Sequence, residues 1–559
     1  MDASSCAASS YASSTKRARE GSIVIEDSLL DGFVTQYSLA GIQESVYIVL
    51  GHGAYQRRFL TCGILCVAAA LFQFMAYQLI GRPVDHWCRP PKGLAHLSAE
   101  AWKNLSIPVE ADGSFSQCTM YDPSELRDSI VSLFDHVCER RRLYDLSSLA
   151  YVVGNTFLAP VAGFVSDRVG RRPVLRACAF VLLLSSVGSS VAATYASLVA
   201  TRIVAVSTGS ATYILTFILL HEVTGNAWRS LFTLLHTAVA ATVVPPLMHA
   251  VPLLEPRWLL AQGLLLVPTA MCATWCCLQE ESPAWLLTTG NMRDAEVAIL
   301  TAAQLNGVDM KKAKATLTVI MPQLGKMDRS QSSTTTVSAA EGTIETVKMR
   351  RHAVSVFIAR FTLSAVYFGV LVRDRATALR WHAAHVFLST AYYEATYWAM
   401  TKWGLRDTLA ALLAVVCSCA LAEAAVISRD YNPAVPFVHA GMKVAVSAAL
   451  GVALCYVGDI FHTNVRSIGV SLSVFFGGAG TLSSVSLIML SGRSANAACS
   501  IFAAFTTLVS IGVVHCLPEV FTEKPKKAPP IRAMTEMERK EELEKSLSFF
   551  AVRKKGKSH

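Results

Sequence analysis

Four charged side chains interrupt long apolar runs of this 559-residue chain. They are Arg360, Glu394, Glu423 and Lys443. A charge in hydrocarbon costs several kcal/mol unless it is paired or hydrated, so each marks a ligand or ion site by default. Arg202, near the end of a further run, belongs with them. The sequence contains no GxxxxGKS or GxxxxGKT phosphate loop, and no nucleophile–base constellation stands out. We therefore expect ligand binding without catalysis and without a cofactor.

The sequence GFVSDRVGRR at 163–172 is typical of a tight turn between two helices. Gly163 allows a neighbouring helix to approach closely, and Gly170 allows a positive φ. Asp167 is suited to bind the N-terminus of another helix or a nearby arginine. The basic residues of the turn are Arg168, Arg171 and Arg172.

Charges with a repeated spacing stand at the ends of two other apolar runs. Glu222 precedes Arg229 by seven residues, and Asp459 precedes Arg466 by seven. Together with the turn at 163–172, these pairs would form a network that closes one side of a helix bundle and opens when its parts move. The alternative is interfacial charge without a gating role. The predicted gating residues are Asp167, Arg168, Arg171, Arg172, Glu222, Arg229, Asp459 and Arg466.

The elements that hold these residues are apolar runs long enough to cross a membrane. The chain is 53% apolar and 16% charged, against about 25% charged in soluble domains, and its mean hydropathy is +0.41. A spanning helix needs about 20 apolar residues. Twelve runs meet this need: 59–81, 147–165, 174–193, 198–220, 231–253, 257–278, 353–372, 383–401, 408–428, 437–457, 468–491 and 498–517. The sequence therefore predicts an all-α membrane protein with twelve transmembrane helices.

Two hydrophilic segments, 82–146 and 279–352, divide the series into two sets of six helices. Basic residues gather in the second segment and in the tail, and the positive-inside rule favours this interpretation over nucleic-acid binding. Both termini are then cytoplasmic, although the basic loop 373–382 opposes the rule. The first 45 residues lack the apolar core of a cleavable signal peptide. The predicted divisions are a tail 1–58, a first half 59–278, a linker 279–352, a second half 353–517 and a basic tail 518–559.

The segment 82–146 is expected to be extracellular. Asn104 begins an Asn-Leu-Ser glycosylation sequon there. Cys88, Cys118 and Cys138 share the segment, which suits an oxidising compartment. Three is an odd number, so one disulfide and one free thiol are expected, with the pairing open. The other cysteines lie in the N-terminal tail or in apolar runs, where they are interpreted as small buried hydrophobes and not as metal ligands.

An internal repeat with a period of about 237 residues carries the fold prediction. The pair Glu222/Arg229 recurs as Asp459/Arg466. The turn glycine after the second helix, Gly170, has a counterpart after the eighth. Similarly, ESP at 281–283 follows the sixth helix, as LPE at 517–519 follows the twelfth. Two six-helix halves with a ligand site between them near mid-membrane is the design of major facilitator transporters.

Further motifs give the chain a resemblance to a narrower group. They are HWCRPP at 86–91, WKNLSIP at 102–108, QCTMYD at 117–122, ESPAWLL at 281–287 and LPE at 517–519. With the cysteine-containing loop, the chain resembles the organic cation, anion and zwitterion transporters of the major facilitator superfamily, from about residue 31 to 519. It departs from them in its second-half turn, in Asp459 and His462, in Arg360, and in a charge-free helix eleven near Gly478.

The resemblance implies which residues meet the substrate. Glu394 and Lys443 match an acid in helix eight and a base in helix ten of that family. Phe217 and Tyr367 match aromatic cavity positions, and His236 falls one helix away. Arg360 stands seven residues before Tyr367 and so shares its helix face. These residues are the predicted substrate contacts, with a salt bridge between Arg360 and Glu394 as the structural alternative.

The predicted function is transport of small organic ions across the plasma membrane by alternating access, either facilitative or by exchange. Two bases against one acid favour anions or zwitterions over cations, while aromatic faces favour cations through cation–π contact. The alternatives are a carrier of neutral, sugar-like solutes and a non-transporting receptor or scaffold on a transporter fold. The expected partners are the substrate and the lipid bilayer, without nucleic acid.

Glycosylation at Asn104 tests the predicted topology. Glycosidase treatment of protein from a glycosylating host should lower and sharpen the band on a gel, because the sequon would be exposed in the secretory lumen. Asn104→Gln should reproduce that shift. An unchanged band would contradict the glycan, and resistance of segment 82–146 to protease on intact cells would overturn the topology.

Overall fold

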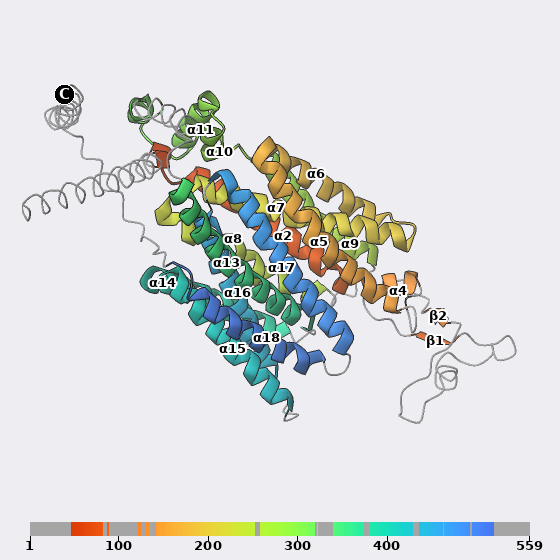
Figure 1. The fold of residues 1–559 in the computed structure, drawn as a ribbon. Helices are drawn as coiled ribbons and strands as arrows, with labels where there is room; N and C mark the ends of the chain where they lie inside the picture. Colours follow the sequence, from red (N-terminus) through yellow and green to blue (C-terminus); the bar gives the residue numbers. More distant parts are fainter. Residues whose placement is uncertain are drawn as a thin grey trace, which may run out of the picture. The chain divides into compact units, whose positions relative to one another are not determined.

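The computed structural model describes residues 46–47, 49–81, 86–88, 121–123, 129–134, 136, 141–251, 258–318, 321, 339–373, 379–428, 435–461, 463–491 and 495–518. These residues belong to one compact unit, a bundle of long helices (Figure 1). The first six long helices are α2 (Ala54–Ile80), α5 (Arg141–Val169), α6 (Arg171–Ser190), α7 (Tyr195–Val223), α8 (Asn226–Ala250) and α9 (Trp258–Cys277). The second six are α13 (Ala339–Arg373), α14 (Leu379–Trp403), α15 (Leu405–Ser428), α16 (Val435–Ile460), α17 (Thr463–Ser491) and α18 (Ala495–Val514).

Eleven of these helices are long and apolar enough to cross a membrane. The twelfth is α14, whose 25 residues are long enough but include Glu394, Lys402 and several His, Tyr and Trp side chains. The predicted run 383–401 lies within it. The helical bundle predicted from the sequence is therefore confirmed, with the start of α2 five residues earlier than predicted.

Shorter elements accompany the bundle. They are β1 (His86–Cys88), β2 (Tyr121–Pro123), α4 (Ile130–Leu133), α10 (Pro283–Thr288) and α11 (Met292–Leu305). Strands β1 and β2 pair antiparallel, with the backbone of Cys88 opposite Tyr121. Asn104, Cys118 and Cys138 lie outside the described residues, so the glycan and the disulfide stay predictions.

The two ends of the bundle can be told apart by the elements found there. Short helices α10 and α11 lie at the end where α2 begins, because Asn306 accepts from the Tyr55 backbone N–H at 2.9 Å. Glu281, just before α10, accepts from the Arg171 backbone at the start of α6. We call this the linker end, and the opposite end, towards α4, β1 and β2, the loop end.

Two sharp junctions at the linker end repeat between the halves. Gly170 joins α5 to α6 with φ 114°, and Gly404 joins α14 to α15 with φ 86°. Side chains with a Cβ adopt such angles only with strain, so glycine is required at both junctions. The predicted role of Gly170 and its counterpart in the repeat are confirmed.

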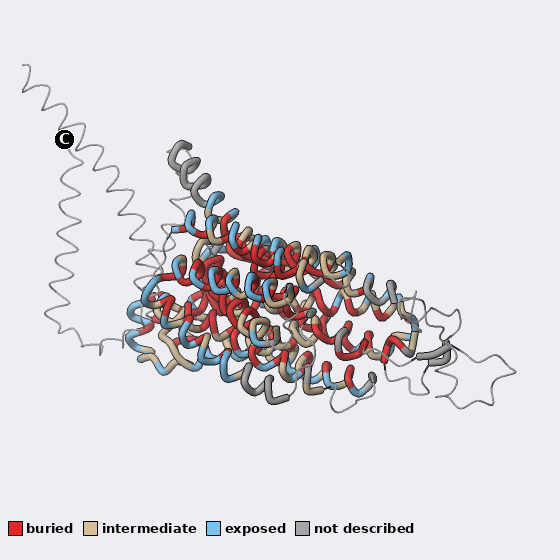
Figure 2. Tube along the Cα trace, turned by 90° about the horizontal axis from the view of Figure 1, so that it is seen from below, coloured by how far each residue is buried: buried red, intermediate tan, exposed pale blue. Residues whose placement is uncertain are grey.

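Helix α17 packs tightly against α5 of the other half and α13 of its own (Figure 1). A Cβ on Gly163 would lie 1.7 Å from Ser471 Oγ, and one on Gly478 would lie 2.4 Å from Thr156 Oγ1. A Cβ on Gly480 would lie 2.1 Å from the Phe361 backbone oxygen. The helices approach this closely only because these positions carry no side chain. Buried residues gather in the interior of the helix bundle (Figure 2).

Substitution of Gly480 by Ala should destabilise the bundle. The new methyl group would meet Phe361 backbone atoms, which cannot rotate away, so we expect a loss of about 1–3 kcal/mol. The measurement is the melting temperature of the protein in detergent.

Gly512→Ala in α18 is the matched control, because nothing lies within 4 Å of its Cβ position. It should leave the melting temperature unchanged or slightly raised. Equal effects of the two substitutions would contradict the close approach of α17 to α13.

Candidate functional site

The turn between α5 and α6 folds the Arg171 side chain into the bundle. Its guanidinium contacts Asp167 Oδ1 at 2.9 Å and Glu222 Oε1 at 3.3 Å. It also donates to the Ser166 backbone oxygen at 3.3 Å. Arg171 is only 1% exposed. A charge this deeply buried is stable only when it is paired, so these acids are required for the turn.

Glu281 holds the start of α6 from the linker. It accepts the backbone N–H groups of Arg171 and Arg172 at 3.2 and 3.0 Å, and that of Ser282 at 2.9 Å. A carboxylate is favoured at a helix N-terminus, where N–H groups lack partners. Burial raises the pKa of the Glu281 carboxyl above its ordinary value, and these three donors oppose the rise. The linker thus contacts the turn directly.

The two seven-residue pairs exchange partners between the halves. Arg466 contacts Glu222 Oε1 at 3.5 Å, and Arg229 contacts Asp459 Oδ1 at 3.4 Å. The spacing had suggested pairing of Glu222 with Arg229 and of Asp459 with Arg466. In the described part of the chain, Glu222 and Asp459 instead each pair with an arginine of the other half, and Glu222 also contacts Arg171 of its own half. These contacts hold the two halves together at the linker end. We call the group that forms them the clasp: Asp167, Arg171, Glu222, Arg229, Asp459 and Arg466.

Asp167 adds a further link between the halves. Its Oδ2 accepts the backbone N–H of Ile468 at 3.1 Å, near the start of α17. The expected arginine partner of Asp167 is therefore found, whereas its backbone partner is the sixth residue of α17 and not the helix N-terminus. Trp285 of α10 donates its indole N–H to the Asp167 backbone oxygen at 3.3 Å. The linker, α5 and α17 thus meet at this residue.

The remaining basic residues of the turn lie outside the clasp. Arg168 is exposed, and its guanidinium lies over the Phe164 ring at 4.4 Å. Arg172 is also exposed and contributes its backbone N–H to Glu281. Neither side chain forms an ion pair with the clasp acids among the residues described.

His221 also belongs to the clasp, although it is not among the residues predicted from the sequence. Its Nε2 lies 3.1 Å from Asp459 Oδ1, and its side chain is fully buried. The repeat could have found it, because position 221 corresponds to Gly458 in the second half. A Cβ on Gly458 would lie 2.5 Å from the imidazole of His221. One half supplies the ring and the other supplies the space for it.

A column of four rings runs from His221 towards the middle of the bundle. The ring centroids are 5.7 Å apart for His221 and Phe217, 6.1 Å for Phe217 and His236, and 5.6 Å for His236 and Tyr213. Phe217 and His236 are fully buried. His236 also packs on α2, since a Cβ on Gly63 would lie 2.3 Å from its ring. Two predicted substrate contacts, Phe217 and His236, are therefore packed against protein here.

Arg360 lies at the far end of this column. It comes from α13 and acts electrostatically on the phenol of Tyr213 in α7, across the two halves. Arg360 is 6% exposed, and its Nε has no hydrogen-bond partner in the described part of the chain. Glu394 is exposed on α14, and no ion pair joins it to Arg360 among the described residues. The salt bridge that was the structural alternative for this pair is therefore absent from the described residues.

The other predicted contacts are buried near the same helices. Tyr367 is 5% exposed and packs edge-on against Phe368 at 5.1 Å. Phe368 in turn lies 4.4 Å from Phe74 of α2, which links the halves towards the loop end. Lys443 of α16 is 6% exposed. The two halves are thus in contact on both sides of Arg360: through the clasp at the linker end, and through Phe74 and Phe368 towards the loop end.

Glu423 has a partner that the sequence did not identify. Its Oε1 lies 3.1 Å from His439 Nδ1, and Ser500 donates to its Oε2 at 3.0 Å. His439 Nε2 lies 3.1 Å from the Val370 backbone oxygen, which can only accept. His439 therefore bridges the Glu423 carboxyl of α15 to the backbone of α13.

Arg202 is likewise paired inside the first half. It is 1% exposed and donates to the side-chain and backbone oxygens of Gln73 at 2.8 and 2.7 Å. Both contacts join α7 to α2. We interpret Arg202 as a residue that holds these helices together.

Comparisons with known proteins agree with this architecture. Residues 112–528 match the family model described as sugar (and other) transporter. The chain belongs to this family. It is a multi-pass membrane transporter, and both its family and its fold are those of transporters.

Curated relatives cover most of this transporter. The carcinine transporter of Drosophila melanogaster is 24% identical over 475 residues, which is 77% of this chain and 70% of the relative. Solute carrier family 22 member 7 of Rattus norvegicus is 23% identical, over 79% of this chain and 88% of the relative. Organic cation transporter 1 of Caenorhabditis elegans is 23% identical, over 77% and 78%.

A solved structure supports the fold independently. The xylose transporter XylE from E. coli, in a partially occluded inward-open conformation, matches with a TM-score of 0.54 at 13% identity. The match covers 83% of this chain and all of that chain. The resemblance predicted from sequence motifs, to organic ion transporters of the major facilitator type, is confirmed by the relatives.

Substitution of Asp167 by Asn should loosen the clasp without unfolding the transporter. The change keeps the volume but removes the charge that faces Arg171, and transport should slow as the closed state is lost. Hydrogen exchange at the start of α17 should speed up, because the Ile468 N–H would lose a charged acceptor.

Asp407→Asn is the matched control. Asp407 lies at the corresponding junction of the second half, where it is exposed and contacts only its neighbour Arg406 among the residues described. Asp407→Asn should change neither the rate of transport nor hydrogen exchange at the start of α17. Unchanged uptake and exchange in Asp167→Asn would remove the gating role.

Proposed function

We propose that this transporter carries small organic ions across the plasma membrane by alternating access, with both termini in the cytoplasm. The observation that supports this proposal best is the exchange of ion pairs between the halves at the linker end. Glu222 and Asp459 each bind an arginine of the other half. Such contacts break when the halves rock apart and reform when they close, which gives the bundle two discrete states.

The linker end is proposed to face the cytoplasm. Arg58, Arg171, Arg172 and Arg176 gather where α2, α6 and α9 reach this end. The positive-inside rule places such a cluster on the cytoplasmic side. On this orientation the present contacts close the inner side, and segment 82–146 is extracellular.

Arg360 is proposed as the residue that binds the charged group of the substrate. It is buried between the halves near Tyr213, without an acid partner among the described residues. A guanidinium can bind a carboxylate or sulfate through two parallel hydrogen bonds. An entering anion would therefore supply the acidic partner that Arg360 lacks among the described residues.

The remaining predicted contacts fit a substrate with an organic body. Tyr367 shares the α13 face of Arg360, while His236 and Phe217 belong to the ring column that ends at Tyr213. Lys443 would add a second base, and Glu394 would reach the site only after a movement of α14. We therefore favour organic anions or zwitterions. Two relatives are named as transporters of carcinine and of β-alanine, each of which contains an amine.

Uptake by cells that express the protein tests the proposed function. Labelled anions, cations, zwitterions and neutral sugars should be compared with and without a preloaded counter-substrate. We expect uptake of an anion or a zwitterion. Uptake of sugars alone would favour a neutral-solute carrier, uptake of quaternary ammonium compounds alone would contradict the charge argument, and no uptake at normal surface expression would favour a receptor.

Substitution of Arg360 by Gln should weaken uptake of the transported anion by about tenfold or more, because a hydrogen bond to a charged group contributes about 1.5–3 kcal/mol. Surface expression should stay close to normal. Lys402→Gln, an exposed base at the end of α14, is the control and should transport normally. Loss of surface expression in Arg360→Gln would instead support a structural role for this residue.

A further inference from the structure

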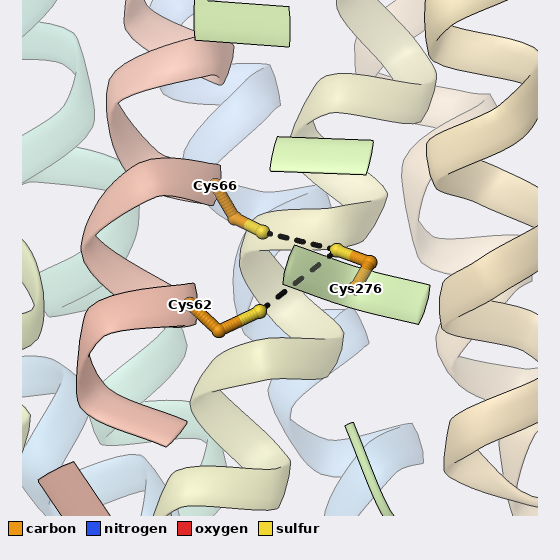
Figure 3. A group of neighbouring side chains, drawn as sticks. All are labelled: Cys62, Cys66 and Cys276. Carbon is orange, nitrogen blue, oxygen red and sulfur yellow. Dashed lines mark hydrogen bonds between the residues drawn. The ribbon is translucent and has the colours of Figure 1, made fainter. Parts of the chain in front are cut away.

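Four buried cysteines from two helices meet in the first half of the bundle. Cys62 and Cys66 are one turn apart on α2, and Cys272 and Cys276 are one turn apart on α9. All four are at most 1% exposed. Cys62, Cys66 and Cys276 point towards one another from their facing helices (Figure 3). These residues, which we call the cysteine cluster, lie outside the transport site described above.

The sulfur atoms are spaced as ligands of one metal ion would be. The Sγ atoms are 3.9 Å apart for Cys62 and Cys276, 3.5 Å for Cys66 and Cys276, and 3.2 Å for Cys66 and Cys272. Cys272 and Cys276 are 4.0 Å apart. A zinc ion with Zn–S bonds of about 2.3 Å holds tetrahedral sulfurs about 3.8 Å apart. The sulfurs of Cys62, Cys66 and Cys276 all lie within 4.8 Å of one another, which makes these three the core of the candidate site. Cys272 adjoins Cys66 and Cys276 and would have to move closer to Cys62 to serve as a fourth ligand.

The sequence had led us to expect no metal here. The spacing within each helix is i, i+4 in an apolar run, where cysteine is ordinarily a small hydrophobe. Packing alone accounts for one or two buried thiols between helices. Here two pairs converge, so four soft donor atoms are brought together at one place between α2 and α9.

We propose that the cysteine cluster binds a soft metal ion, Zn²⁺ or Cu⁺, and so pins α2 to α9. Thiolates select these ions over hard cations such as Mg²⁺ and Ca²⁺. Two of the four sulfurs as thiolates neutralise Zn²⁺, and one neutralises Cu⁺, with the released protons passing to solvent. Charge neutrality matters because a net charge in this buried position is costly.

The position of the cysteine cluster indicates how the ion would enter and which part of α2 it would hold. Cys276 is the penultimate residue of α9, and Arg58, one turn before Cys62, donates to the Leu278 backbone oxygen just beyond that helix. The ion would therefore enter from the linker end. Gly63, which supports His236 of the ring column, directly follows Cys62. An ion in the cluster would fix the part of α2 that contacts the column.

The test uses the full-length protein, purified in detergent under reducing conditions. Co²⁺ should produce the thiolate charge-transfer and tetrahedral d–d absorption bands, and Zn²⁺ should remove them by displacement. Zn²⁺ and Cu⁺ are then added separately, with metal per protein measured by mass spectrometry. One ion should bind per chain and raise the melting temperature, while excess Mg²⁺ or Ca²⁺ should not compete.

The double variant Cys66→Ser/Cys276→Ser should lose the bound ion and its thermal effect. Cys417→Ser/Cys419→Ser is the matched control, since it also removes two cysteines from the membrane-spanning bundle, both of them on α15 of the other half. It should bind like the wild type. Equal metal binding by both variants would overturn the proposal.

A measurement on the wild type keeps the test decisive if the double variant fails to fold. Bound Zn²⁺ or Cu⁺ should slow alkylation of the four cluster thiols by N-ethylmaleimide at least tenfold. The exposed Cys277 and Cys516 should react at the same rate with and without metal. Unprotected cluster thiols, or a disulfide between Cys66 and Cys272 in the protein isolated from cells, would overturn the metal site. These readouts do not depend on transport, so they stand apart from the proposed function.

Discussion

The carboxylate of Glu222 is the point on which the linker end of the bundle depends. Its side chain is fully buried, and its Oε1 contacts two guanidinium groups, Arg171 of its own half and Arg466 of the other. Removal of one partner from a buried ion pair costs about 3–5 kcal/mol, because the remaining charge stays uncompensated. The halves can separate here only if these charges find water or new partners. Because the buried charges must stay paired or become hydrated, the clasp has two stable states, closed and open.

Close backbone contact makes this clasp geometrically possible. Glycines on α5 and α17 let these helices touch across the halves, so that Asp167 reaches the Ile468 N–H. Gly458 in α16 makes room for His221, which then meets Asp459. The charged contacts are therefore short because side chains are absent beside them. Each contact therefore combines an ion pair or hydrogen bond with a neighbouring glycine. This combination suits an interface that has to close repeatedly in the same geometry.

The ring column relates the clasp to the buried base in the middle of the bundle. His221 contacts Asp459 at one end, and Tyr213 lies in the field of Arg360 at the other. The rings come from α7 and α8 of the first half, while Asp459 and Arg360 come from the second. A ligand that displaced Arg360 from Tyr213 would act on rings packed against the clasp. The column is thus a physical connection between the proposed substrate site and the gate, made of packed side chains.

The sequence by itself determined the helical elements, the two-half repeat, the turn at 163–172 and the family resemblance, because apolar run length, glycine and charge spacing are local properties. It also identified most clasp residues, since charges at helix ends stand out in a membrane protein. Only the tertiary structure decided their partners. Glu222 pairs with Arg466 although Arg229 is far closer in sequence, because the facing helix ends belong to different halves. For the same reason, Glu423 found His439, Arg360 and Glu394 were separated, and four cysteines from two distant segments came together. Sequence periodicity predicts which face of a helix a residue occupies. The residues that this face contacts are decided only by how the helices pack.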